Sequence, residues 1–289
     1  MGFFYRNIEG LLGNSNVERL LCFDWLGMGG SERISCRASP RMPLIPCCDS
    51  KLSTSEAVGF FIDPLEDWLR YQNLSNVTLV GHSLGGYLSM RYVVKYPGRI
   101  DKLVLASPVG FPSVPVDSLP RGQMPLGLKL LDTLWSKNFT PQQIVRFLGG
   151  VQGKKAVKRV LKARLGQSIS DHEAEILGDY FYHITCAKAS GEYAMNSLLK
   201  PVATSRSAHV YAREDLETLA LTGDSFGLSS FRVMFGDHDW MRQGEPSART
   251  VSKYLNERHG LDTSVSILNN AGHHLYMDNP QEFHTTILS

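Results

Sequence analysis

Short apolar runs rich in β-branched residues alternate with longer polar–apolar segments along this chain. The apolar runs are typical of buried strands, and we expect five of them, at residues 19–23, 77–80, 102–105, 231–235 and 264–268. Residues 56–71 and 84–96 have helical spacing, and Pro97 ends the second segment. The alternation predicts an α/β fold, with a mostly parallel sheet and helices on both faces.

One long segment interrupts the alternation. From about residue 112 to residue 228 the pattern is helical, and it then returns to a strand. We expect this insertion to form a helical lid over the sheet. The predicted organisation is a sheet-containing core at residues 1–112, the lid at 113–228 and the rest of the core at 229–289.

Composition narrows the class of protein. The hydrophobic content of 43% and the charged content of 20% are ordinary for a globular protein of 289 residues. No apolar run approaches the length of a membrane-spanning helix. Five cysteines without a C-x-x-C pair argue against a disulfide framework and against a zinc site. The net charge of +2 does not point to nucleic acid, and we expect no such partner.

The string Gly81-His82-Ser83-Leu84-Gly85 matches G-x-S-x-G, the pattern of a nucleophile elbow. A predicted strand precedes it and a predicted helix follows it, which is the context that the elbow needs. Because the serine lies on a sharp turn, we expect Gly81 and Gly85 to be positions without room for side chains. The Leu84 N–H, at the start of the helix, is then placed to donate to an oxyanion. A glycine-rich turn with an incidental serine is the alternative.

A serine hydroxyl needs a base, and the base needs an acid that orients it. In elbow-type enzymes the acid follows the serine in the chain and the histidine comes last. Asp239 has the G-x-x-D spacing after the strand at 231–235 and is our predicted acid. Asp237 is the alternative, although it is more typical of a turn or cap. Asp237-His238-Asp239 has metal-ligand chemistry, but a site would need two more ligands and none stands out in the sequence, so we predict no metal.

The predicted base follows the last strand. His273 comes directly after Gly272, and an imidazole can serve as neutral base and then as acid near neutral pH. His274 is the alternative. His82 lies beside the serine, but adjacent side chains of an elbow diverge, so we expect it to support the site.

Several strings resemble one branch of the α/β-hydrolases, that of lysophospholipases, lysophosphatidic acid acyltransferases and fungal cardiolipin deacylases. They are D-W-L-G-M-G-G-S (24–31), F-F-I-D-P-L-E-D-W (60–68), G-H-S-L-G-G-Y-L (81–88), G-D-H-D-W-M (236–241) and G-H-H-L-Y-M-D-N-P (272–280). The resemblance covers nearly the whole chain. It implies a glycerophospholipid or lysophospholipid acyl ester as substrate, and it maps a catalytic triad onto Ser83, Asp239 and His273.

The resemblance also implies a second activity. Family members carry an H-x-x-x-x-D string linked to acyl transfer, which here runs from His273 to Asp278. The same string fits a catalytic histidine followed by a helix-capping aspartate. Hydrolysis requires no cofactor or metal, whereas acyl transfer would use acyl-CoA as co-substrate.

The start of the chain departs from the family pattern. The family motif H-G-x-G-A-G, which holds the second oxyanion donor, precedes G-F-F-Y-R-N, and this chain opens at Met1 followed by that string. The resemblance therefore implies that the first strands and the oxyanion loop are missing. Loss of one oxyanion donor typically costs ~10²–10³ in rate. Two other functions stay open: a non-catalytic lipid-binding or co-activator protein or inactive fragment, and a general soluble carboxylesterase.

The lid carries an uneven charge. Between Thr133 and Ser170 there is no Asp or Glu, but there are eight basic residues, with apolar residues between them at helical spacing. The basic residues are Lys137, Arg146, Lys154, Lys155, Lys158, Arg159, Lys162 and Arg164. A basic amphipathic helix can lie on an anionic lipid surface, so we expect peripheral membrane contact here. An ordinary charged surface is the alternative. The expected location is intracellular, in the cytoplasm or peripheral on an organelle membrane such as the mitochondrial one.

Overall fold

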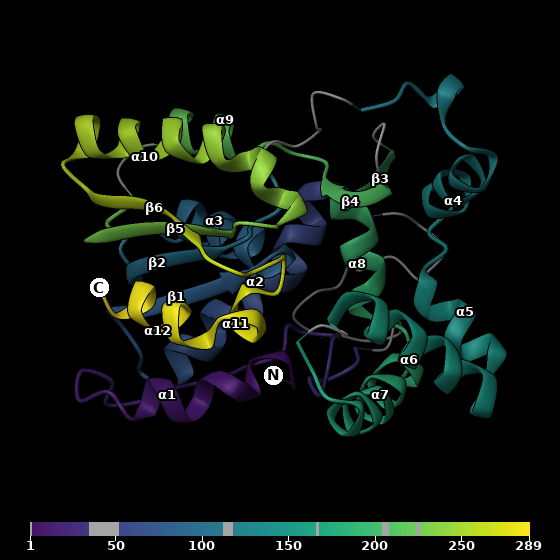
Figure 1. Ribbon diagram of the computed structural model, residues 1–289. Helices are drawn as coiled ribbons and strands as arrows, with labels where there is room; N and C mark the ends of the chain where they lie inside the picture. The colour runs from purple at the N-terminus through teal and green to yellow at the C-terminus, as the bar shows by residue number, and fades with distance from the viewer. Residues whose placement is uncertain (1, 35–51, 112–117, 166–167, 204–207, 224–225) are drawn as a thin grey trace.

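A computed structural model describes residues 2–34, 52–111, 118–165, 168–203, 208–223 and 226–289. Within these residues, a sheet of four parallel strands has the order β1-β2-β5-β6 (Figure 1). The strands are β1 (Val77–His82), β2 (Ile100–Ala106), β5 (Ser230–Gly236) and β6 (Asp262–Leu268). They confirm four of the five predicted strands and the parallel sheet.

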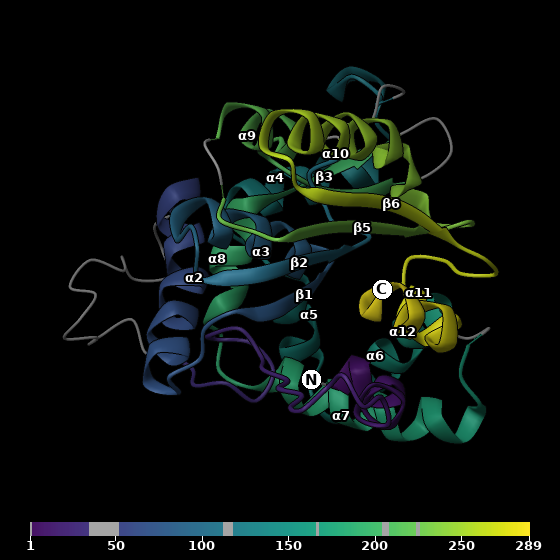
Figure 2. The ribbon, with the colours of Figure 1, turned by 90° about the vertical axis from the view of Figure 1, so that its left-hand side faces the viewer.

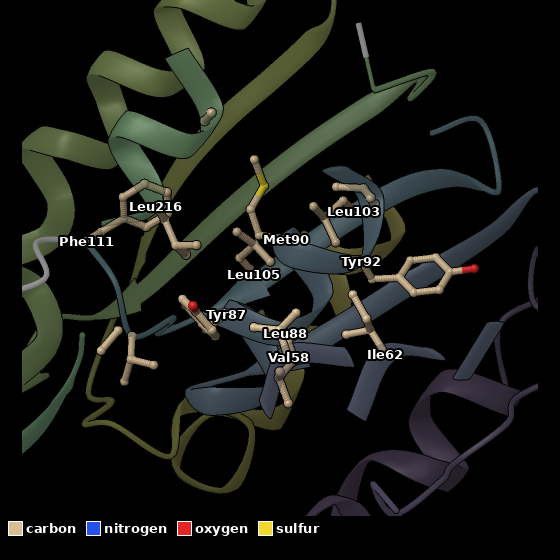
Figure 3. Close-up of a cluster of buried hydrophobic side chains, with 14 of the residues drawn as sticks. Val58, Ile62, Tyr87, Leu88, Met90, Tyr92, Leu103, Leu105, Phe111 and Leu216 are labelled. Carbon is tan, nitrogen blue, oxygen red and sulfur yellow. The ribbon is translucent and has the colours of Figure 1, made fainter. Parts of the chain in front are cut away.

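Helices cover both faces of the sheet because side chains alternate along each strand. Leu103 and Leu105 of β2 point into one apolar cluster, and Val104 and Ala106 point into the other. The first cluster includes residues of α2 (Thr54–Tyr71), α3 (Leu84–Lys95), α9 (Leu216–Thr222) and α10 (Glu245–His259), and part of it is drawn in Figure 3. The second is covered by η1 (Gly2–Asn7), α11 (Leu275–Asp278) and α12 (Pro280–Leu288), with α1 (Ile8–Leu12) beside α12. In Figure 2, α2 and the α11–α12 segment lie on opposite sides of the strands.

The two predicted helices form for local reasons. Helix α2 begins at a capping box, in which Ser53 and Glu56 bond to each other's backbone N–H. Its apolar side chains Phe61 and Ile62 are buried against the sheet. Helix α3 ends at Lys95, two residues before Pro97, because proline cannot continue the hydrogen-bond ladder.

The strand predicted at residues 19–23 is wrong. These residues form no strand, and Leu21 remains 37% exposed. An apolar run becomes a strand only when another strand supplies its hydrogen-bond partners. Within the described residues, no strand pairs with this segment, and β1 pairs with β2 alone.

The segment between β2 and β5, called the insertion below, contains most of the remaining helices. They are η2 (Arg121–Gln123), α4 (Leu126–Ser136), α5 (Pro141–Leu148), α6 (Gly150–Leu165), α7 (Asp171–Cys186) and α8 (Gly191–Leu198). Figure 1 shows α4 to α8 to the right of the sheet. The predicted lid boundary at residue 113 lies outside the described residues, so the division into domains stays a prediction.

The insertion is not wholly helical, which corrects the sequence prediction. Strands β3 (Leu199–Ala203) and β4 (Ala208–Ala212) form an antiparallel pair. Val202 and Tyr211 are buried in the main apolar cluster. Apolar runs this short do not distinguish strand from helix by periodicity alone. Tertiary packing therefore determines the conformation.

The described helices also bear on membrane topology. None of those that the structure describes has both the length and the apolar character to cross a bilayer.

Candidate active site

Ser83 lies on a strained turn between β1 and α3. Its backbone has φ 54° and ψ −117°, outside the regions that non-glycine residues normally adopt. Three hydrogen bonds hold it there: its N–H donates to Ala106 O at 3.0 Å, and its carbonyl accepts from Tyr87 N–H at 3.1 Å and Val109 N–H at 3.2 Å. The turn is thus fixed by the neighbouring strand as well as by its own helix, and Ser83 stands at the end of β1.

The glycines of the elbow differ in how strictly they are required. A Cβ at Gly81 would lie 2.5 Å from Gly85 O, and one at Gly86 would lie 2.9 Å from Pro108 Cβ. A Cβ at Gly85 would meet its nearest neighbour, Trp25 Nε1, only at 3.5 Å, an ordinary contact distance. The expected lack of room holds at Gly81, whereas the prediction for Gly85 is wrong because a Cβ there would make only an ordinary contact with the Trp25 indole.

Asp239 follows β5 and its side chain is fully buried. Its carboxylate accepts hydrogen bonds from the Ser107 hydroxyl and, at 2.9 Å, from the Met241 N–H. Ser107 is itself held at the end of β2, where its N–H donates to Met234 O at 2.8 Å. Buried carboxylates need such donors to offset lost hydration. Sequence reasoning missed Ser107, whose one signal was its position directly after a strand.

The His273 imidazole bridges the serine and the acid. Its Nε2 lies 3.1 Å from Ser83 Oγ, and its Nδ1 lies 3.2 Å from Asp239 Oδ1. An Nδ1–H that donates to the carboxylate leaves the Nε2 lone pair directed at the serine hydroxyl. The structure therefore brings the three predicted residues together in the geometry that nucleophile activation needs.

Asp237, the alternative acid, has other partners. Its carboxylate accepts from Asn270 N–H at 3.0 Å and from Ala271 N–H at 2.9 Å. These backbone donors are the largest cause that lowers its pKa, to about 2. Asp237 therefore ties the end of β5 to the loop that leads to His273, as expected of a turn residue.

The two histidines next to His273 also bond elsewhere. His82 is half-buried, and its Nε2 lies 2.8 Å from the backbone O of His273. Burial, together with the charges of His273 and His274, holds its pKa well below the usual range, so the neutral ring donates to that carbonyl. His274 Nδ1 lies 3.0 Å from Tyr276 OH, and burial lowers the pKa of His274 to about 3. Both rings support the loop that carries His273.

Asp278, the second residue of the H-x-x-x-x-D string, bonds to the backbone and to the insertion. Its Oδ2 accepts from the Gly272 N–H at 2.8 Å, and its Oδ1 accepts from the Ser168 hydroxyl. It therefore fixes the position of the loop at His273, while Asp239 orients the ring.

Leu84, the expected oxyanion donor, is the first residue of α3. An N–H at that position has no acceptor within its own helix, so it is available to a ligand.

An aromatic wall borders the imidazole. The Trp240 ring lies 4.8 Å from the His273 ring, and His209 stacks on Trp240 at 4.1 Å with an interplanar angle of 9°. Because His209 belongs to β4, the insertion contributes directly to the site. Sequence reasoning gave neither residue a role: Trp240 directly follows Asp239 in the chain, whereas nothing local distinguishes His209. Among the residues that the structure describes, no three His, Cys, Asp or Glu side chains converge as metal ligands would.

Comparison with known proteins gives a consistent family. Residues 2–148 match the model of the alpha/beta hydrolase fold. The chain is 33% identical to a probable 1-acylglycerol-3-phosphate O-acyltransferase of Oryza sativa subsp. japonica, over 99% of this chain and 63% of that protein. It is also 33% identical to the 1-acylglycerol-3-phosphate O-acyltransferase of Arabidopsis thaliana, over 99% of this chain and 62% of that protein. The chain thus spans less than two thirds of the length of these two plant proteins.

A lipase relative and two solved structures extend the comparison. The (lyso)-N-acylphosphatidylethanolamine lipase of Bos taurus is 26% identical over 99% of this chain and 74% of that protein. A bromoperoxidase from Bacillus anthracis superposes with a TM-score of 0.61 at 17% identity, covering 99% of this chain and 86% of that one. An esterase from Exiguobacterium antarcticum gives a TM-score of 0.55 at 16% identity, over 99% and 85%. At these sequence identities, the structural similarity shows a common fold and nothing about activity.

Proposed function

Since the chain belongs to the alpha/beta hydrolase fold family, we propose that it is a serine hydrolase that cleaves acyl esters of glycerophospholipids or lysophospholipids. The observation that carries the proposal is the position of the His273 ring between Ser83 Oγ at 3.1 Å and Asp239 Oδ1 at 3.2 Å. A neutral imidazole in that position can take the serine proton while the carboxylate stabilises the resulting charge.

In the proposed reaction, Ser83 Oγ attacks the ester carbonyl as His273 Nε2 accepts the hydroxyl proton. The tetrahedral intermediate collapses, the C–O bond to the alcohol breaks, and His273 returns the proton to the departing alcohol. Water then attacks the acyl-serine with His273 again as base, which releases the fatty acid and restores Ser83. The Leu84 N–H donates to the oxyanion during both acylation and deacylation of Ser83. This chemistry needs no metal or organic cofactor.

The lipid part of the proposal rests on the relatives and on one cation. Two plant relatives bear acyltransferase names for acylglycerol phosphates, and the Bos taurus relative bears a phospholipid lipase name. Arg164 is exposed at the end of α6 and pairs with no carboxylate among the described residues. Burial and the charge of His273 are the two largest causes that lower the pKa of His274, the residue after the base. The charge of Arg164 is the third cause. A guanidinium at that position is suited to a substrate phosphate.

Acyl transfer is the second activity that we propose. It would follow if acyl-CoA supplied the acyl group to Ser83 and a lysophospholipid hydroxyl, in place of water, then attacked the acyl-serine. The acyltransferase names of the plant relatives favour it.

Fluorophosphonate labelling tests the proposal. We expect the purified chain to be labelled and a Ser83→Ala variant to remain unlabelled. A folded wild-type protein that stays unlabelled would favour the non-catalytic lipid-binding alternative. Labelling combined with a preference for short esters over phospholipids would favour the general carboxylesterase.

A further inference from the structure

Helix α5 presents its apolar side to solvent. Ile144 is 45% exposed, Phe147 90% and Leu148 44%, and no residue of α5 is buried. Positions i, i+3 and i+4 lie on one face of a helix, so the three side chains form a continuous stripe. A surface helix in water normally turns such a stripe toward the core. Exposed stripes of this kind mark surfaces that bind something apolar.

The orientation of α5 is held by a buried polar contact. Arg146 makes a bidentate ion pair with Glu192 of α8, which is 3% exposed, and also donates to Thr185 O at 3.0 Å. Thr140, at the start of α5, donates to the same carboxylate at 2.6 Å. Breaking a buried pair leaves an uncompensated charge. The helix therefore cannot rotate to bury Phe147 without giving up this contact.

A basic ridge on α6 follows the apolar stripe along the chain. Val151 follows the Gly149–Gly150 turn and is 67% exposed. Lys155 and Arg159 follow at intervals of four residues on the same face, and both are exposed. The surface formed by Ile144, Phe147, Leu148, Val151, Lys155 and Arg159 is called the α5–α6 edge below. Figure 1 places α5 on the side of the molecule away from the sheet.

Only part of the positive charge of this region is neutralised. Lys154, Lys158 and Lys162 pair with carboxylates of α7, and Arg146 pairs with Glu192. Among the described residues, the other four basic side chains have no carboxylate partner; they are Lys137, Lys155, Arg159 and Arg164. Two of these four belong to the α5–α6 edge, so an apolar stripe lies beside unpaired positive charge.

We propose that the α5–α6 edge docks the protein on the surface of an anionic phospholipid bilayer. Phe147, Leu148 and Val151 enter the interface between headgroups and acyl chains, and Lys155 and Arg159 lie over the anionic headgroups. The combination of apolar area with charge is what interfacial binding uses. A second copy of this chain is the less suitable occupant, because like-charged ridges would face each other.

Vesicle co-sedimentation tests the docking surface. We expect binding to vesicles of phosphatidylcholine with phosphatidylserine, weaker binding to phosphatidylcholine alone, and a decrease with added salt. Phe147→Ser combined with Val151→Ser should lower the partition coefficient at least about tenfold. Lys155→Gln with Arg159→Gln should lower it by about tenfold on anionic vesicles and have little effect on neutral ones.

Two matched controls separate docking from general surface effects. Tyr71→Ser removes an 82% exposed aromatic ring from α2, and Lys253→Gln with Arg258→Gln removes two charges from α10. Neither should change binding. All variants are also measured in combination with Ser83→Ala. Vesicle binding is then tested independently of hydrolysis, so a failure of the hydrolysis proposal does not affect the interpretation.

Equal binding to neutral and anionic vesicles would overturn the proposal, as would Phe147→Ser/Val151→Ser protein that sediments like the wild type. A dimer in lipid-free solution that the same double variant dissociates would instead assign the edge to self-association.

Discussion

The Ser168 hydroxyl donates a hydrogen bond to Asp278, and through this carboxylate the insertion is joined to the loop that carries His273, the proposed base. The other carboxylate oxygen accepts the N–H of Gly272, the residue before His273, at 2.8 Å. Asp278 thus acts on His273 through the backbone, and Asp239 is the carboxylate that contacts the ring. Asp239 therefore holds the ring of His273, and Asp278 holds the backbone beside it.

The first prediction concerns Asp278. We expect Asp278→Ala to lower hydrolysis and acyl transfer in parallel, by about tenfold, because the loop at His273 loses its anchor. Asp278→Asn keeps an acceptor for Gly272 and should restore much of both rates. Steady-state kinetics with water and with a lysophospholipid as acceptors provides the measurement. Selective loss of acyl transfer would show instead that Asp278 takes part in the chemistry.

The second prediction distinguishes Asp239 from Asp237. Asp239→Asn should lower kcat by ~10³–10⁴, because an amide no longer selects the productive histidine tautomer. Asp237→Asn should leave kcat within about tenfold and lower thermal stability instead, since Asp237 holds two loop N–H groups. Kinetics and thermal unfolding of both variants check this. The assignment fails if the two effects are exchanged.

The third prediction concerns the elbow glycines. Gly81→Ala should destabilise the protein by about 2–3 kcal/mol, because the new Cβ would meet Gly85 O at 2.5 Å. Gly85→Ala, whose Cβ has its nearest neighbour at 3.5 Å, should change stability by less than about 1 kcal/mol. Urea unfolding of the matched pair gives both values. Similar losses for the two variants would contradict the packing described at the elbow.

The fourth prediction tests Arg164 as a phosphate contact. Arg164→Gln should raise KM about tenfold for an anionic lysophospholipid and leave a neutral monoacylglycerol unaffected. Arg159→Gln is the control, because it removes the same charge from an adjacent turn of α6, about 140° around the helix. Detergent-dispersed substrates keep membrane docking out of the comparison. An equal rise in KM for the neutral ester would remove Arg164 from the substrate site.

The fifth prediction is a pH dependence of stability. The pKa of His274 is about 3 in the folded protein, against an ordinary value of 6.5. Below pH 6.5 the unfolded chain binds a proton that the folded protein does not, so stability falls as the pH drops from 6.5 toward 3. His274 alone should cost about 1.4 kcal/mol between pH 7.5 and pH 5.5.

His274→Asn is the variant for this measurement, because its amide can still bond to Tyr276 and does not titrate. Its loss of stability between the two pH values should be smaller than that of the wild type by that amount. Equal losses in urea unfolding would mean that the ring accepts a proton in the folded state.

Much of the site could be predicted because its signals are local. The strand, the turn and the helix around Ser83 all lie within residues 77–96, and each candidate acid and base follows its own strand. Ser107 and His209 were not found this way. They reach the site through contacts between segments that are distant in the chain, such as the stacking of His209 from β4 on Trp240.

The sequence by itself determined the parallel strands, the two core helices, the elbow and the order of its partners, because these depend on periodicity and on short-range backbone sterics. The tertiary structure determined which of several neighbouring histidines and aspartates makes each contact. His273 rather than His274 or His82 contacts Ser83 across 190 residues, and Asp239 rather than Asp237 contacts His273. It also decided that residues 19–23 form no strand and that α5 turns Phe147 outward. Such outcomes depend on partners supplied by distant segments, and a local pattern does not contain them.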